Sequence, residues 1–244
     1  NQQTTYDIDM NVKSGYGTFV SAMSVETRIL KTNKDGSQHI AMTVHRWRET
    51  TRFGKEVTTF DSSGDAKPHE DEGWAGLRKL IGKTLCMAYV DADGTRSRMI
   101  FSEDADQIWK KQGSQSMERA RDVLSLALPK LPGKVVKLGD TWTEERNPLG
   151  EQLPFAFKMT HKVTAIDPVT GVVHFALEGP AAAGKSDLNV TKVTIKASNS
   201  QGIFDCEMGR MLAYSCGGDF KARTGEADLA SETEFEWKLS IKVR

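Results

Sequence analysis

The sequence predicts a mainly β protein of the α+β type, in which a curved antiparallel sheet or half-barrel has a few short helices packed on it. The strongest observation is that apolar and charged side chains alternate throughout residues 231–244. Only a strand places successive side chains on opposite faces. Shorter stretches repeat this alternation, and turns containing Asp and Gly separate them. One dry face and one charged face are typical of an antiparallel sheet with one side in water.

The first third of the chain is expected to be sheet. Residues 16–32 and 38–50 alternate apolar with polar side chains. Between them, residues 33–36 end in Asp-Gly, which tolerates the positive φ of a tight hairpin. Residues 56–60 predict a third strand. Residues 65–73 are acidic and nearly free of apolar side chains, so we expect a surface loop there.

Short helices and one hairpin follow. Apolar residues recur at helical spacing over 74–81, which predicts a short helix. Residues 83–90 and 96–101 are expected to pair as a hairpin. Ser102 then suits the cap of a second short helix, because its hydroxyl can accept a hydrogen bond from an unpaired amide, and this helix should end near Gly113.

The longest predicted helix begins at Ser114 or Ser116 and ends before Pro129 and Pro132, because proline cannot continue a helix. Its apolar stripe consists of Met117, Ala120, Val123, Leu124, Ala127 and Leu128. After it we expect the strands 141–145, 155–166, 172–178, 190–197, 203–205, 211–215 and 231–244.

We expect residues 1–244 to form a single domain. Its two sheet-forming halves, about 6–101 and 136–244, are joined by the helical segment 102–135. Two separate domains are the alternative, since 244 residues suit either arrangement.

Composition excludes some classes of protein. The 33 basic and 33 acidic residues give zero net charge, whereas a nucleic-acid binder usually has a basic excess, so no nucleic-acid partner is expected. No apolar run approaches the ~18 residues that a membrane span requires. The chain begins at Asn1 without a methionine, which would suit a trimmed exported protein. Membrane contact is therefore expected only through a removed leader or lipid anchor.

The three cysteines are expected to be free, buried thiols. No two of them form a CxxC pair. If Met208-Gly209 is a two-residue turn, Cys206 lies opposite Met211, and a bridge from Cys206 to Cys216 would be out of register.

Residues 179–186, Gly-Pro-Ala-Ala-Ala-Gly-Lys-Ser, match the phosphate-binding pattern GxxxxGK[ST]. Such a loop needs a helix that begins at its Lys-Ser pair, so that the helix dipole faces the phosphate. Residues 187–197 are instead rich in β-branched residues and predict a strand. We therefore expect a Gly/Ala loop between antiparallel strands and no nucleotide.

Other motifs are weaker still. Residues 91–94 lack the third acidic position and the spacing of a calcium loop. His69-Glu70-Asp71-Glu72 could gather a hard cation, but we interpret these four polar residues as a solvated loop. The histidines of the predicted strands stand alone. Nucleophile motifs are absent. No catalytic residue, cofactor or metal is predicted. The basic and aromatic cluster over 46–55, formed by Arg46, Trp47, Arg48, Arg52, Phe53 and Lys55, is interpreted as a solvated sheet face.

Aromatic residues on the dry strand faces are the candidate ligand site. They would line the concave side of a curled sheet and enclose an apolar cavity for a lipid, acyl chain or peptide. The alternative is a core packed against the long helix. The residues are Phe155, Phe157, Phe175, Phe235 and Trp237.

Short motifs carry a resemblance. Gly139-Asp140-Thr141-Trp142, and Phe204-Asp205 followed by Gly209, resemble motifs of an uncharacterised family of exported bacterial proteins and lipoproteins. The order of elements also resembles the half-barrels of envelope lipoprotein carriers. The resemblance implies a periplasmic or outer-envelope location and a sheet wrapped on helices, and it supplies no catalytic residues.

These observations favour a non-enzymatic envelope protein that binds an apolar ligand or an envelope partner chain in a curved sheet. The alternatives are a scaffold or interaction protein with a solid core and an enzyme with dispersed catalytic residues.

Overall fold

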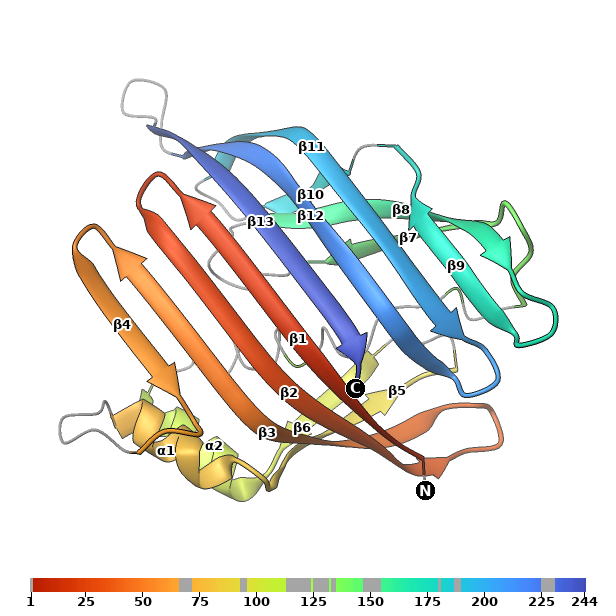
Figure 1. Ribbon diagram of the computed structural model, residues 1–244, viewed down its shortest axis with the longest axis horizontal. Coiled ribbons are helices and arrows are strands. Elements are labelled where there is room, and N and C mark those ends of the chain that lie inside the picture. Colours follow the sequence, from red (N-terminus) through yellow and green to blue (C-terminus); the bar gives the residue numbers. More distant parts are fainter. Residues whose placement is uncertain are drawn as a thin grey trace.

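Thirteen strands join into one antiparallel sheet in the computed structural model (Figure 1). The structure describes residues 2–65, 72–92, 96–112, 124, 132, 135–146, 155–179, 181–186, 190–224 and 231–244. The strands are β1 (Gln3–Ser14), β2 (Gly17–Thr32), β3 (Gln38–Phe53), β4 (Glu56–Asp61), β5 (Thr84–Val90), β6 (Arg96–Phe101), β7 (Thr141–Arg146), β8 (Phe155–Ile166), β9 (Val172–Leu177), β10 (Ala182–Ser186), β11 (Val190–Asp205), β12 (Arg210–Thr224) and β13 (Ser231–Val243). The described residues also contain the helices α1 (Glu72–Leu80) and α2 (Glu103–Gln112). The predicted fold class is confirmed.

The two ends of the chain meet in the middle of the sheet. The strand order is β10-β8-β9-β11-β12-β13-β1-β2-β3-β5-β6, with β4 paired to β3 and β7 paired to β8. The first and last strands are therefore neighbours, and Met10 lies opposite Leu239 in their antiparallel register. This pairing makes the N-terminal and C-terminal strands parts of one sheet.

As the alternation predicted, strand β13 has one buried face and one charged face. Trp237, Leu239 and Ile241 are buried. On the opposite face, Glu234 accepts ion pairs from Lys196 of β11 and Lys221 of β12, at 2.8 and 2.7 Å. We call the buried side of the sheet the inner face.

The sheet is strongly curved. Phe157 of β8 packs against Trp237 of β13, with ring centroids 4.9 Å apart. Three strands lie between these two in the sheet, so in a flat sheet with strands about 4.8 Å apart they would be roughly 19 Å apart. The sheet therefore folds back over its own inner face, as Figure 1 shows for β7, β8 and β10 behind the long strands.

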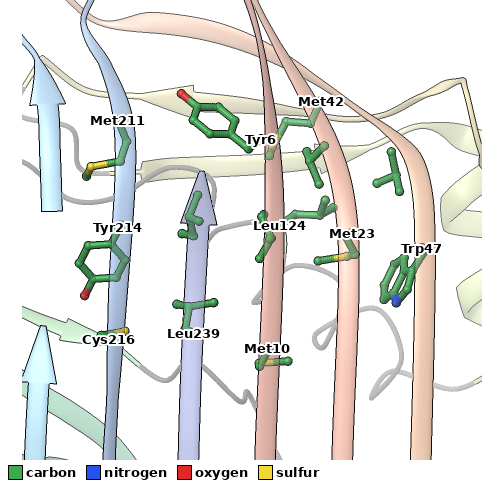
Figure 2. Packing of buried hydrophobic residues seen from close by; sticks show 14 of the residues in the cluster. Tyr6, Met10, Met23, Met42, Trp47, Leu124, Met211, Tyr214, Cys216 and Leu239 are labelled. Carbon is green, nitrogen blue, oxygen red and sulfur yellow. The ribbon is translucent and has the colours of Figure 1, made fainter. Parts of the chain in front are cut away.

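Side chains fill the middle of the inner face. Figure 2 shows Met10, Met23 and Leu239 gathered around Leu124, which is fully buried. Leu124 is helical and belongs to the stripe predicted for the longest helix. The rest of that predicted helix lies outside the described residues, so Leu124 alone shows that this segment contributes to the core.

Strand β1 was not identified from the sequence, which assigned no strand before residue 16. Its side chains nevertheless alternate, and Tyr6, Ile8, Met10 and Val12 are all buried. Polar residues at positions 1–5 obscured the start of this pattern. The missed strand is central, because it hydrogen-bonds to both β2 and β13.

The two short helices agree with the sequence analysis. The hydroxyl of Ser102 accepts a hydrogen bond from the amide of Ala105 at 3.4 Å, as expected for a cap of α2. The two helices touch at Gly76, where a Cβ atom would lie 2.6 Å from Ile108. Within the described residues, no helix has the length and apolar character needed to cross a membrane.

The Gly/Ala loop expected over residues 179–186 is corrected in one respect. Residues 182–186 are not a loop but strand β10, which pairs antiparallel with β8. Lys185 and Ser186 thus lie in a strand, and no helix begins at them. The helical dipole that a phosphate-binding loop requires is therefore missing at this position.

Candidate functional site

An open-sided pocket of about 580 Å³ lies on the inner face of the sheet. It is at the end where the chain begins and where β11 turns into β12. The side-chain amide of Gln2 donates a hydrogen bond to the carbonyl of Met208 and thereby ties these two segments together. The volume is within the usual range for small-molecule sites, about 300–1,000 Å³.

The pocket walls are mostly apolar and come from both halves of the chain. Side chains of several strands contribute, among them β2, β3, β8, β9 and β12, and Pro132, Val135 and Val136 add apolar surface from the segment before β7. Curvature brings these strands together around one space. The apolar strand residues of the wall include Ile29, Ile40, Val163, Val173, Phe175 and Met211.

Phe175 occupies its place because of a glycine. It lies opposite Gly202 in the register of β9 and β11. A Cβ atom on Gly202 would be 2.1 Å from Cζ of Phe175, so the ring covers the glycine backbone directly. The absence of a side chain at position 202 therefore sets the position of this pocket wall.

Two polar residues of the wall were not identified from the sequence, Tyr6 and Arg210. Burial raises the pKa of Tyr6 to about 12, although the nearby positive charge of Arg210 acts in the opposite direction. Tyr6 is therefore a neutral hydroxyl at physiological pH. The alternation of β1 could have revealed Tyr6, whereas nothing in the sequence marks Arg210.

A buried polar pair lies behind the aromatic wall. Nε2 of His161 is 2.9 Å from Oε1 of Glu144, and the side chains are 1% and 5% exposed. The His161 ring also contacts Trp142 and Phe175, two residues of the pocket wall, at centroid distances of 5.2 and 5.4 Å. The pair thus orients the wall from behind and does not itself line the pocket.

The structure describes the side chains of four of the five predicted ligand-lining residues. Phe175 lines the pocket. Phe157 and Trp237 pack on each other away from it, and Phe235 stacks on Phe220 with centroids 4.8 Å apart. The side chain of Phe155 lies outside the described part, although its backbone pairs with Ser186. Ligand lining by these residues stays a prediction.

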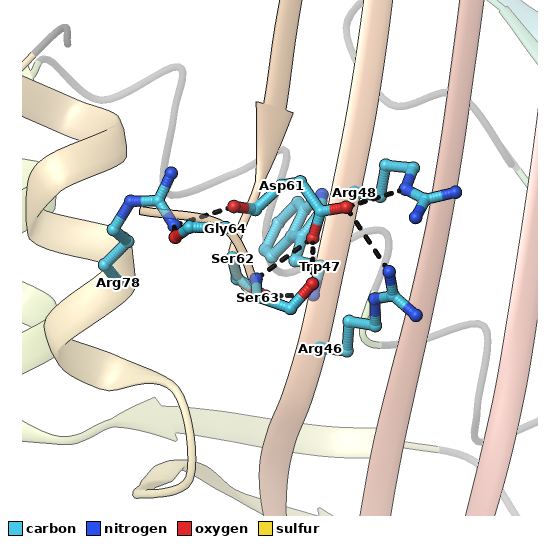
Figure 3. Close-up of polar contacts among 8 residues, drawn as sticks. All are labelled: Arg46, Trp47, Arg48, Asp61, Ser62, Ser63, Gly64 and Arg78. Carbon is cyan, nitrogen blue, oxygen red and sulfur yellow. Dashed lines mark hydrogen bonds and ion pairs between the residues drawn. The ribbon is translucent and has the colours of Figure 1, made fainter. Parts of the chain in front are cut away.

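The basic and aromatic cluster is engaged in intramolecular contacts (Figure 3). Arg46 and Arg48 form ion pairs with Asp61 at 3.3 and 3.0 Å. Trp47 points to the opposite face and is buried. Arg78 of α1 donates hydrogen bonds to the carbonyls of Asp61 and Gly64, which fastens the helix to this corner of the sheet.

A second hollow, of about 670 Å³, lies on the outer face over β12, β13 and β1. Its lining includes Asp9, Asn11 and Glu236, and Glu236 is already paired with Lys13 and Lys238. A charged, solvated surface of this kind is weaker evidence for a ligand than the apolar pocket.

The cysteine prediction is partly wrong. None of the three forms a disulfide, and Cys86 and Cys216 are buried, but Cys206 is exposed at the pocket rim. It lies in the turn between β11 and β12, because Asp205 pairs with Arg210 and the turn is longer than the predicted two residues. Among the described residues, no three His, Cys, Asp or Glu side chains are placed to hold a metal ion.

Comparison with known proteins identifies no family for this chain. No family model matches the sequence, and no curated protein matches it. Among solved structures, one that the comparison found is a DUF1329 family protein from Desulfovibrio piger, which is 8% identical with a TM-score of 0.15. The alignment covers 97% of this chain and 83% of that one.

Proposed function

We propose that this protein is a non-enzymatic binding protein for an apolar ligand, a lipid or acyl chain, held on the inner face of the curved sheet. The observation that carries the proposal is the pocket of about 580 Å³ with apolar walls from both halves of the chain. Pockets of this size and character are the usual sites of small apolar ligands. A location in the bacterial envelope, expected from the sequence resemblance, is part of the proposal.

A neutral fluorescent probe tests it. N-phenyl-1-naphthylamine should bind the purified protein with increased fluorescence, and lipids from a bacterial envelope extract should displace it. Ile29→Trp should weaken binding at least tenfold, because Ile29 lies in the pocket wall and the larger side chain fills the space.

Leu30→Trp is the matched control. Leu30 is the next residue of β2, lies on the opposite face and is 46% exposed. It introduces the same side chain outside the pocket and should leave binding unchanged. Native mass spectrometry of the protein with envelope lipids should show adducts for Leu30→Trp and not for Ile29→Trp. Equal binding by both variants, or no binding by the unsubstituted protein, refutes the proposal.

A scaffold protein with a solid core is the second candidate. It is favoured by the aromatic cluster, in which Phe157 contacts both Trp237 and Phe220 and fills the inner face on the side away from the pocket. This alternative predicts that no envelope lipid binds and that partner chains attach to the outer face.

A further inference from the structure

We propose that Arg210 binds the anionic headgroup of the ligand, which makes the ligand a long-chain carboxylate. This inference rests on the proposed function, because it assumes that the pocket is a ligand site. It adds the chemical class of the guest and the residue that recognises it.

The first argument is that one nitrogen of the guanidinium group is unsatisfied. Nε of Arg210 is buried and has no hydrogen-bond partner. No ion pair to Arg210 exists among the residues that the structure describes. A buried cationic donor without a partner is unfavourable, and a carboxylate would supply both the hydrogen bond and the opposite charge.

The second argument is position. Arg210 is the first residue of β12 and lies in the pocket wall beside the apolar Met211. Its positive charge lowers the pKa of the Tyr6 hydroxyl and thus acts against the larger effect of burial. Tyr6 also lies in the wall. An anion at Arg210 would therefore meet a neutral hydroxyl nearby, while the alkyl chain would extend along Ile40, Val163 and Phe175.

Among the described residues that line the pocket, one carries the opposing charge. Asp91 lies at the rim and is exposed to solvent, so water already satisfies it. Arg210 is half-buried and its Nε is shielded from solvent, so its charge is less hydrated than that of Asp91. Because charge complementarity is set mainly by desolvated groups, we expect selectivity for an anion over a cation.

Three ligands with one alkyl chain and different headgroups provide the test. Dodecanoate, dodecan-1-ol and dodecyltrimethylammonium compete with N-phenyl-1-naphthylamine at pH 8, below their micelle concentrations. We expect dodecanoate to bind the unsubstituted protein about 10- to 100-fold more tightly than the alcohol, the range for a charge-assisted hydrogen bond. The cation should bind most weakly.

Substitution of Arg210 should abolish this ranking. Arg210→Met should reduce the ratio of acid to alcohol affinity to about 1–3, since a neutral side chain removes the charge-assisted bond. Arg210→Lys should retain part of the preference. Arg28→Met is the control, because Arg28 is exposed on the outer face of β2 and should leave the ranking unchanged.

The outcomes separate the two proposals. If the dye does not bind the unsubstituted protein, the proposed function fails. If the dye binds but acid and alcohol compete equally, the pocket remains a ligand site and the assignment to Arg210 is overturned. A preference for the cation also overturns it. If Arg210→Met does not fold, equal competition by acid and alcohol in the unsubstituted protein still overturns the proposal, and Arg210→Lys tests the residue.

Discussion

His161 and Glu144 form a buried polar contact at 2.9 Å, on the two neighbouring strands β8 and β7, behind the aromatic wall of the pocket. Nδ1 of His161 is buried as well and has no hydrogen-bond partner. The imidazole thus has one described partner, Glu144, in surroundings made of aromatic rings. Loss of that partner would leave both ring nitrogens without a bond.

The first prediction concerns this pair. Glu144→Met should lower the free energy of unfolding by about 2–4 kcal/mol, because it removes the described hydrogen-bond partner of a buried imidazole. Urea denaturation followed by tryptophan fluorescence measures the change. Glu56→Met, at an exposed residue of β4, should change stability by no more than about 0.5 kcal/mol. Equal effects of the two substitutions would contradict a stabilising role for the buried pair.

The second prediction concerns the glycine beneath Phe175. Gly202→Ala should destabilise the protein by about 1–3 kcal/mol, because the new methyl group cannot fit under the ring without moving it. Dye binding should weaken in parallel, since Phe175 forms part of the pocket wall.

Gly15→Ala is the matched control for this prediction. A Cβ atom on Gly15 would meet no heavy atom within 4 Å, and its φ is not positive. The same methyl group should therefore be tolerated there. If Gly202→Ala is as stable as Gly15→Ala, the close approach of the Phe175 ring is wrong.

The third prediction concerns the packing of β8 on β13. Phe157→Ala should cost about 3–5 kcal/mol of stability, the usual loss for a buried aromatic side chain. Phe53→Ala, at a residue that is 62% exposed, should cost less than about 0.5 kcal/mol. A small effect at Phe157 would mean that β8 does not fold back over the inner face in solution.

Local features of the fold could be predicted from the sequence, because alternation and turn chemistry are local signals. The face assignments in β13 are confirmed, as is the hairpin at residues 33–36, where Gly36 has φ of 86°. Alternation shows which residues share a face but not which strand is the neighbour. The pairing of β1 with β13 and the contact of Phe157 with Trp237 were therefore beyond the sequence argument.

The position of the pocket also depends on which strands meet, which alternation does not show. The sequence analysis selected large aromatic residues as the lining, and large aromatic residues are the ones that fill space when a sheet curls onto itself. Phe157 and Trp237 lie where the layers meet. In the pocket, Phe175 and Trp142 share the wall with smaller side chains such as Val163 and Val173. Arg210 has no local pattern that distinguishes it from a surface arginine.

The fourth prediction concerns acid stability at the corner shown in Figure 3. The hydroxyl of Ser63 donates to Asp61 and lowers the pKa of that carboxyl, as do the Ser63 amide and then Arg48 and Arg46. Because the folded pKa is lowered, these contacts stabilise the protein above the unfolded value of about 3.9, and the stabilisation is lost as the pH falls below it.

Asp61→Asn should therefore lower the free energy of unfolding at pH 7 by about 1–3 kcal/mol, the range for hydrogen bonds to a charged group. The difference from the unsubstituted protein should shrink between pH 5 and 3, the range in which a carboxyl of about 3.9 titrates. Ser63→Ala should act in the same direction, since it removes the largest contribution. A constant difference across this pH range would show that Asp61 does not contribute through its charge.

The fifth prediction uses Cys206 as a reporter of the pocket. Cys206 is exposed at the rim, whereas Cys86 and Cys216 are buried, so N-ethylmaleimide should add one label to the native protein. Partial burial raises the pKa of the Cys206 thiol, and the carboxylate of Asp205 raises it further. Because the thiolate is the reactive form, labelling should be slow at pH 7 and should accelerate as the pH rises above about 8.5.

Mass spectrometry of the intact protein over time measures this reaction. Asp205→Asn should accelerate labelling at pH 7, because removal of the negative charge lowers the thiol pKa, and Cys206→Ala should abolish labelling. Bound dodecanoate should slow the reaction if the ligand occupies the pocket. Two or three labels on the native chain would contradict the burial of Cys86 and Cys216. A rate unaffected by dodecanoate, in protein that binds it, would place the ligand away from the turn between β11 and β12.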